Sequence, residues 1–99
     1  MIHSAILATY VLMCSWYGPG FLGARTASGE VFSAVKHTCA SKWLRFGTIL
    51  RLERGWRHSW CRVNDRGPFV YGRDLDVSPV VARELNFVGV VPIRVSILR

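Results

Sequence analysis

Residues 63–70, Val-Asn-Asp-Arg-Gly-Pro-Phe-Val, form the most informative stretch of the chain. The stretch opens as an extended run and turns sharply at its Gly-Pro pair, with Asp65 just before the turn. A strand that ends in this way presents polar side chains at the rim of a sheet, where a substrate can reach them. Residues 15–21 and 26–30 contain between them the same aromatic, glycine and acidic residues. We therefore expect these three stretches to be edges of one site.

The chain upstream of this stretch predicts short strands separated by turns. Apolar and polar side chains alternate after Gly47, so residues 44–52 read as a strand with one buried face. Residues 53–58 predict a turn, and residues 59–65 pair back across it as a hairpin. Residues 15–28 hold four glycines or prolines and predict a long structured loop.

The chain downstream predicts one short helix and a final strand. Ser78 can cap the first helical turn, and the proline that follows it suits the first helical position. The helix is expected over residues 80–85, with Asn86 closing it. Residues 71–77 predict a short extended segment, and the alternation in residues 90–98 predicts a terminal strand.

The fold class follows from the number and order of these elements. A further strand is expected near residues 38–40 and a first strand within residues 5–14. Five or six strands, one short helix and no repeated βαβ unit predict an all-β fold, a small closed barrel.

The apolar run of residues 5–14 has two interpretations. It is too short to span a bilayer, so no stable membrane span is expected. It could be the core of an export signal, but no lysine or arginine precedes it, and Met13 is a poor residue for a cleavage site. A buried first strand is slightly favoured, with residues 1–4 frayed. We accordingly assign residues 1–14 to this N-terminal segment and residues 15–99 to the barrel domain.

Length and charge limit the class of protein. Ninety-nine residues make one domain, and half of them are apolar in short runs, which argues against disorder. The formal net charge of +7, with nine arginines in residues 51–99, favours a polyanionic partner such as nucleic acid, acidic lipid or the anionic bacterial wall. A basic surface that only aids solubility is the alternative. The arginines lack the aromatic-interleaved strand pattern of a nucleic-acid-binding surface, so no nucleic acid is expected.

The cysteines leave two alternatives open. A Cys39–Cys61 disulfide would close a loop of about twenty residues and add about 3 kcal/mol to a small core, which favours an oxidising compartment. Both could instead be buried free thiols, and Cys14 is left over in either case. With His37 and His58 the two thiols would offer zinc two nitrogen and two sulfur ligands, but the spacing is not that of a known finger. We therefore expect no metal and no cofactor.

Five blocks of sequence together resemble the rare lipoprotein A family. The resemblance covers nearly everything from Ser15 to the end of the chain, and five blocks in the family's order are far more specific than any one of them. The blocks are residues 15–21 (SWYGPGF), 26–30 (TASGE), 44–48 (LRFGT), 63–69 (VNDRGPF) and 72–78 (GRDLDVS).

The resemblance implies both a fold and an activity. The family has a six-stranded double-psi β-barrel, similar to the barrel of expansins, barwin-like proteins and certain endoglucanases. Its members are implied to be lytic transglycosylases that cleave the glycan strands of bacterial peptidoglycan and leave 1,6-anhydro-muramic ends. The resemblance thus implies an extracytoplasmic protein, in the periplasm, in the cell envelope or secreted, and we expect a monomer. A non-catalytic, expansin-like module that binds wall polysaccharide is the alternative.

Three catalytic residues carry over by motif: Glu30, Asp65 and Asp76. A fourth does not, because Ser41 stands where family members usually place a histidine. His37 lies four positions away, about 13 Å in an extended segment, and is not an obvious substitute. The change at Ser41 is the feature that separates the enzyme from the binding module.

The chemistry explains why carboxyl groups matter at these positions. Cleavage of a glycosidic bond needs an acid to protonate the departing oxygen and negative charge to stabilise an oxocarbenium-like transition state. Glu30, with apolar neighbours, is the better proton donor on local grounds, and Asp65 beside Arg66 suits a stabiliser. The alternatives are that Glu30 is a solvated loop acid, that Asp65 hydrogen-bonds a turn, and that Asp76 caps a helix. Substrate-binding residues are expected to be Trp16, Tyr17, Ser41, Asn64, Arg66 and Arg73.

Overall fold

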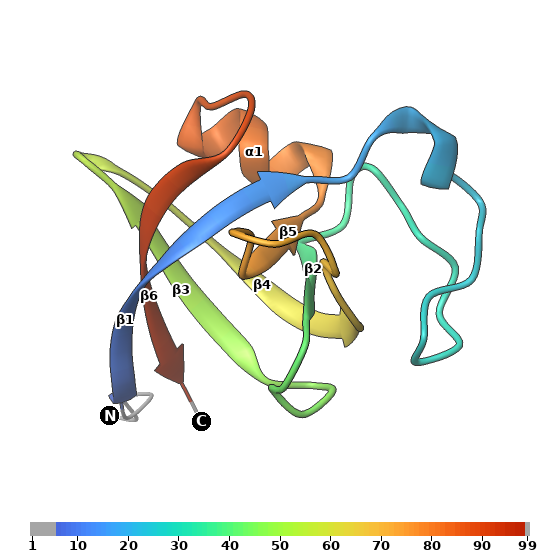
Figure 1. Cartoon of the computed structure of the whole chain (residues 1–99), viewed down its shortest axis with the longest axis horizontal. Coiled ribbons are helices and arrows are strands. Elements are labelled where there is room, and N and C mark those ends of the chain that lie inside the picture. Colours follow the sequence, from blue (N-terminus) through green and yellow to red (C-terminus); the bar gives the residue numbers. More distant parts are fainter. Residues whose placement is uncertain (1–5, 99) are drawn as a thin grey trace.

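The computed structural model describes residues 6–98 as one six-stranded barrel with a short helix at one end (Figure 1). The expected fraying of residues 1–4 lies outside the described residues. In chain order the elements are β1 (Ile6–Trp16), η1 (Pro19–Phe21), β2 (Thr38–Ser41), β3 (Ile49–Arg54), β4 (Arg57–Asp65), β5 (Leu75–Val77), α1 (Pro79–Leu85) and β6 (Val91–Leu98).

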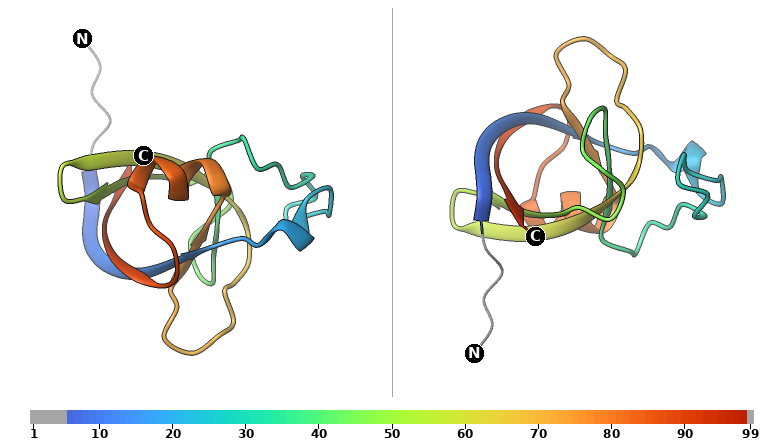
Figure 2. Two further views of the ribbon diagram at one scale, coloured as in Figure 1. Left: turned by 90° about the horizontal axis from the view of Figure 1, so that it is seen from above. Right: turned by 90° about the horizontal axis from the view of Figure 1, so that it is seen from below.

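The strands close into a ring in the order β1-β5-β2-β4-β3-β6. The β1–β5 and β2–β4 pairs are parallel, and the other four pairs are antiparallel. Seen from above and below, the strands form a ring, from which the segment between β1 and β2 projects to one side and the loop between β4 and β5 projects to another (Figure 2). The small closed all-β barrel predicted from the sequence is therefore confirmed.

Alternating side chains fill the barrel. In the β3–β4 hairpin Leu50 and Leu52 face inward with Cys61 and Val63, while the residues between them face outward. Helix α1 closes one end of this core by burying Val81, Ala82 and Leu85. The same core also contains Cys14, Cys39, Leu44, Leu75, Val77, Phe87, Ile93 and Val95.

Cys39 and Cys61 are joined by a disulfide inside the barrel. Their Cα atoms lie 5.8 Å apart on the neighbouring strands β2 and β4. The bond takes up both sulfur atoms, so neither cysteine is free to act as a zinc ligand. Cys14 is a buried free thiol on β1, and burial raises its pKa to about 12.

Two strand predictions were too long, because turns replace their first halves. Strand β3 begins only at Ile49, since residues 42–48 form a loop in which Gly47 has a φ of 89°. That left-handed conformation suits glycine and interrupts the strand predicted from residue 44. Similarly, residues 71–74 form a turn and β5 covers only Leu75–Val77.

The helix ends as predicted but begins differently. Asn86 adopts a left-handed conformation, and its N–H donates to the carbonyls of Ala82 and Arg83, so its closing role is confirmed. Capping by the Ser78 side chain is wrong, because its hydroxyl donates instead to the carbonyl of Lys36, at 2.7 Å. No helix within residues 6–98 is long and apolar enough to cross a membrane.

Candidate functional site

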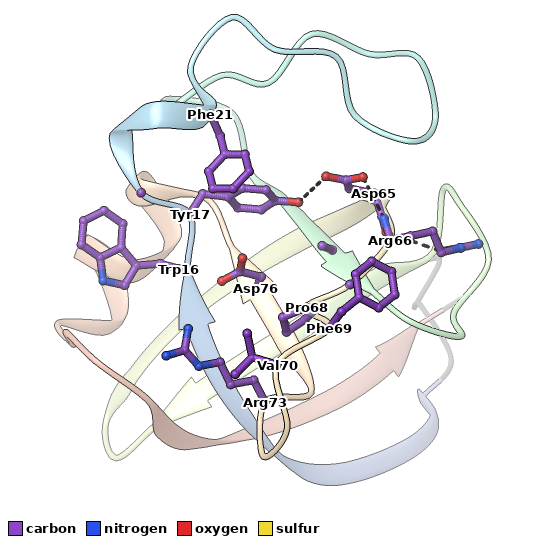
Figure 3. Close-up of a pocket in the computed structure, with 13 residues that line it drawn as sticks. Trp16, Tyr17, Phe21, Asp65, Arg66, Pro68, Phe69, Val70, Arg73 and Asp76 are labelled. Carbon is purple, nitrogen blue, oxygen red and sulfur yellow. Dashed lines mark hydrogen bonds between the residues drawn. The ribbon is translucent and has the colours of Figure 1, made fainter.

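A cleft of about 450 Å³ opens where the long loops meet the rim formed by β1, β2, β4 and β5 (Figure 3). One wall is aromatic and comes from the end of β1 and from η1. The other comes from the loop between β4 and β5. The cleft is lined by Trp16, Tyr17, Gly18, Phe21, Ala40, Asp65, Arg66, Gly67, Pro68, Phe69, Val70, Arg73 and Asp76.

Strand register places two carboxylates on this rim with a small residue between them. Ala40 of β2 pairs with Asp65 on one side, across the parallel β4, and with Asp76 on the other, across the antiparallel β5. Neighbouring strands lie about 4.8 Å apart, so the backbones of the two acidic residues are about 10 Å apart across the sheet. Ala40 extends only one methyl group into this gap, which leaves room for a ligand between the acids.

Asp65 is held by three hydrogen bonds to its two carboxylate oxygens. The Tyr17 hydroxyl donates to Oδ2 at 2.8 Å, and the backbone N–H groups of Ala27 and Arg66 donate to Oδ1 at 2.8 and 2.9 Å. The Ala27 bond fixes Asp65 to the loop after η1, 38 residues earlier in the chain. Because both oxygens act as acceptors, the geometry is that of a fixed negative charge.

Packing holds the Tyr17 side chain in position to bond Asp65. Its ring is only 4% exposed and stacks on Phe32, with 4.4 Å between ring centroids. Burial, together with the bonded Asp65 carboxylate, raises the pKa of Tyr17 well above its usual value. Tyr17, expected to bind substrate, therefore lines the cleft as a constant hydrogen-bond donor to Asp65, with little of its ring exposed to a ligand.

Asp76 is a partly buried carboxyl on the same cleft. Burial raises the pKa of this carboxyl above its usual value, although the Ser15 hydroxyl, which donates to Oδ1 at 2.9 Å, and the charge of Arg73 oppose the shift. The negative charge of Asp65 adds to the rise. A carboxyl with a raised pKa, open to a cleft, is suited to donate a proton. Asp76 accepts its hydrogen bond from Ser15, so it does not cap the helix.

Glu30 lies outside the cleft. The Arg62 guanidinium donates to both of its carboxylate oxygens, at 2.5 and 2.9 Å. This pair holds the pKa of Glu30 below its usual value, the opposite of the rise that its apolar sequence neighbours suggested. The structure thus brings two of the three expected acids together in the cleft, and the third pairs with an arginine.

Arg66 and Ser41 organise the loop beside the cleft. The Arg66 guanidinium donates to the carbonyls of Ser41 and Leu44, at 3.2 and 2.8 Å, and lies 4.0 Å from the ring centroid of Phe46. The Ser41 hydroxyl oxygen accepts from the backbone N–H groups of Trp43 and Leu44, at 3.3 and 3.0 Å. Ser41 is buried and does not line the cleft.

The remaining expected site residues divide into two groups. Trp16 and Arg73 line the cleft, whereas Asn64 is 2% exposed and is not among the residues that line it. The expected set lacked Ala40, Phe69 and Val70, although the last two follow directly on the Gly-Pro pair that marked the site. Two apolar residues directly after a predicted turn could have indicated, from the sequence, that they belong to the site. Ala40 has no such signal, because its importance comes from strand pairing alone.

Comparisons with known proteins agree on one family. A family model described as lytic transglycolase matches residues 9–96. An endolytic peptidoglycan transglycosylase RlpA of Campylobacter jejuni is 39% identical over 90 residues, covering 87% of this chain and 33% of that protein. A probable one of Aquifex aeolicus is 40% identical, covering 86% of this chain and 39% of that protein. The chain therefore spans about a third of the length of these curated relatives.

A solved structure shares the fold. Streptomyces papain inhibitor superposes with a TM-score of 0.73, covering 95% of this chain and 97% of that one. The two are 18% identical, so this likeness bears on the fold alone. Together with the family model and the closed strand order, it confirms the double-psi β-barrel expected from the sequence blocks.

Proposed function

Because the chain belongs to the lytic transglycolase family, we propose that it cleaves the glycan strands of bacterial peptidoglycan by an intramolecular transglycosylation. The printed names of its relatives support this substrate and reaction. The observation that carries the proposal to this chain is the cleft in which Asp65 and Asp76 flank Ala40. Two carboxyl groups in different environments supply the acid and the negative charge that the reaction needs.

Asp76 is the proposed acid and then the base. Its proton passes to the glycosidic oxygen as the bond from that oxygen to the anomeric carbon breaks. The C6 hydroxyl of the same sugar attacks the anomeric carbon and gives its proton to the Asp76 carboxylate. One bond is broken and one is formed, water is not consumed, and the product ends in a 1,6-anhydro ring.

Asp65 is the proposed electrostatic stabiliser. Its three hydrogen bonds fix the carboxylate, so its charge faces the oxocarbenium-like centre without reorganisation. Trp16, Phe21 and Phe69 offer apolar surfaces to the sugar rings, and Arg73 offers a cation to the carboxylates of the polymer. Glu30 has no direct role in this proposal, because it pairs with Arg62 outside the cleft.

The site of action follows from the substrate. Peptidoglycan lies outside the cytoplasmic membrane, so we infer that the protein works there, in the periplasm, in the envelope or after secretion. The Cys39–Cys61 disulfide supports an oxidising compartment. One barrel contains the whole proposed site, which supports action as a monomer.

The test of this function is incubation of the purified protein with isolated peptidoglycan, followed by mass spectrometry of the released fragments. Fragments with anhydro ends are expected from the unaltered protein. They should fall by about a hundredfold or more with Asp76→Asn, a typical loss for a general acid. Glu30→Gln should lose much less, because Glu30 lies outside the cleft. Absence of anhydro ends from the unaltered protein would contradict the proposed activity.

One observation favours the non-catalytic alternative. The Ser41 hydroxyl, at the position where the family resemblance implies a histidine, is occupied by two backbone N–H groups and does not face the cleft. Binding of peptidoglycan without anhydro products would support the binding module. Restoring activity with Ser41→His would then identify this position as the cause.

A further inference from the structure

Two smaller hollows continue from the cleft along helix α1. The first, of about 160 Å³, is lined by Trp16, Pro79, Ala82, Arg83 and Phe87. The second, of about 300 Å³, shares Ala82, Arg83 and Phe87 with the first and adds Asn86 and Val88. Trp16 also lines the main cleft, so the three depressions are neighbours, each sharing at least one lining residue with the next. We call the part beyond Trp16 the α1 track.

The α1 track has an apolar floor and one cation. Ala82 and Phe87 are buried beneath it, whereas Val88 is exposed at its far end. Arg83 is exposed at the last turn of α1 and lines both hollows. Among residues 6–98, no acidic residue lines the track. This combination fits a ligand that has an apolar face and carries a negative charge.

We propose that the α1 track binds the continuation of the same glycan strand, with the carboxylate of an N-acetylmuramic acid residue at Arg83. The inference rests on the proposed function, because it assigns to this track the sugars next to those in the cleft. A polymer cut internally extends beyond the cut on both sides, so its neighbouring rings lie on a surface continuous with the cleft. Trp16 stands at that junction, on the opposite side of the cleft from Asp65 (Figure 3).

A second large hollow fits this role less well. It has about 520 Å³ and lies against the loop of residues 42–48, where Trp43, Arg45 and Phe46 line it. Within the described part of the chain it has no lining residue in common with the cleft. Arg66 stands between the two, with its guanidinium over Phe46. Because this hollow shares no lining residue with the cleft, Arg45 is a suitable control.

The experiment measures affinity against ligand length by calorimetry. The ligands are peptide-free peptidoglycan oligosaccharides of four and eight sugars, and chitooligosaccharides of the same lengths, which lack the carboxylate. Asp76→Asn is the parent protein, so that no ligand is consumed. Into it are introduced Arg83→Gln, the charge-keeping Arg83→Lys and the control Arg45→Gln.

The expected result has three parts. The parent binds the eight-sugar peptidoglycan ligand more tightly than the four-sugar one. Arg83→Gln lowers affinity for the longer ligand by about two- to fivefold, the usual size for an exposed ion pair. Arg83→Lys retains most of the affinity, Arg45→Gln retains all of it, and no variant changes binding of the chitooligosaccharides.

Two results would overturn the inference in different ways. Equal affinity for both lengths, or an Arg83→Gln protein indistinguishable from its parent, removes the α1 track as a subsite while leaving the cleft intact. If no ligand of either length binds to the parent, and the unaltered protein makes no anhydro ends, the proposed function fails and the inference fails with it.

Discussion

The pKa of the Asp76 carboxyl is set by effects that oppose one another. Burial raises the pKa of its carboxyl, while the Ser15 hydrogen bond and the charge of Arg73 lower it. A general acid must be protonated to act, so activity should decline as pH rises through the pKa of Asp76 in the folded protein. That decline should lie at higher pH than for an ordinary aspartate, whose pKa is 3.8.

Arg73→Gln tests this balance. Removing the arginine takes away a charge that favours ionised Asp76, so the pKa of Asp76 should rise further. The falling limb of the plot of kcat/KM against pH should therefore move to higher pH. Lys42→Gln, an exposed loop cation that does not line the cleft, serves as the control. An unmoved limb in Arg73→Gln would mean that Asp76 is not the titrating acid.

Asp76→Asn should raise stability at neutral pH while it lowers activity. A carboxyl whose folded pKa is raised above its unfolded value stabilises the fold only at low pH, and this contribution is lost as pH rises through the folded pKa. At neutral pH the buried charge opposes folding, so the asparagine variant should be more stable than the unaltered protein while nearly inactive. Denaturation should show this difference shrinking as pH falls through the raised pKa of folded Asp76 and absent below pH 3.8, where both states are protonated. A variant less stable at neutral pH would contradict the argument.

Tyr17→Phe removes one donor from Asp65 and leaves the aromatic packing on Phe32. A hydrogen bond to a charged group contributes about 1.5 kcal/mol or more, so the free energy of unfolding should fall by about that amount. Turnover should fall as well, since Asp65 is less firmly held. Tyr10→Phe, at an exposed tyrosine on β1, should change neither quantity. Calorimetry and the product assay measure both effects.

At the scale of elements, the disulfide links two strands that are far apart in sequence. Cys39 and Cys61 are separated by 22 residues, and closing such a loop contributes about 3 kcal/mol to stability. The unfolded, unreduced protein should react with an alkylating agent at Cys14 alone, and the reduced protein at all three cysteines. Mass spectrometry counts the added groups. Three groups before reduction would exclude the bond.

The loop of residues 42–48 is held by contacts with Arg66. The Arg66 guanidinium donates to the carbonyl of Leu44 in the loop and to that of Ser41 at the end of β2, and it covers the Phe46 ring. A lysine cannot reproduce these contacts because it lacks the planar group. Arg66→Lys should therefore speed hydrogen exchange at Leu44, by about fivefold for each 1 kcal/mol lost. Arg45→Lys in the same loop should not. Unchanged exchange in Arg66→Lys would show that other contacts hold the loop.

The sequence predicted elements well where the pattern was local. Alternation identified the β3–β4 hairpin, and Asn86 was correctly expected to close α1. The start of β3 and the Ser78 cap were wrong, because competing contacts decide both. Gly47 turns the chain before β3, and the Lys36 carbonyl takes the Ser78 hydroxyl. Neither competitor is visible from periodicity.

At the scale of the whole molecule, the site is a product of topology. Asp65 and Asp76 are brought to one rim because β2 lies between β4 and β5, an order that no local pattern encodes. The resemblance to a known family supplied that expectation. It did not supply the partner of Glu30, because Arg62 is 32 residues away and pairing depends on how the loop folds back.

In the proposed function, the glycan strand binds in the cleft between Asp65 and Asp76. The most direct measurement is a nuclear magnetic resonance titration of isotope-labelled Asp76→Asn protein with a peptide-free peptidoglycan tetrasaccharide. Shifts are expected for the backbone amides of Tyr17 and Gly67, which line the cleft, and of Ala27, which donates to Asp65. No shifts are expected along β3 on the opposite side of the barrel. Shifts confined to β3, or no shifts at all, would contradict the proposed function.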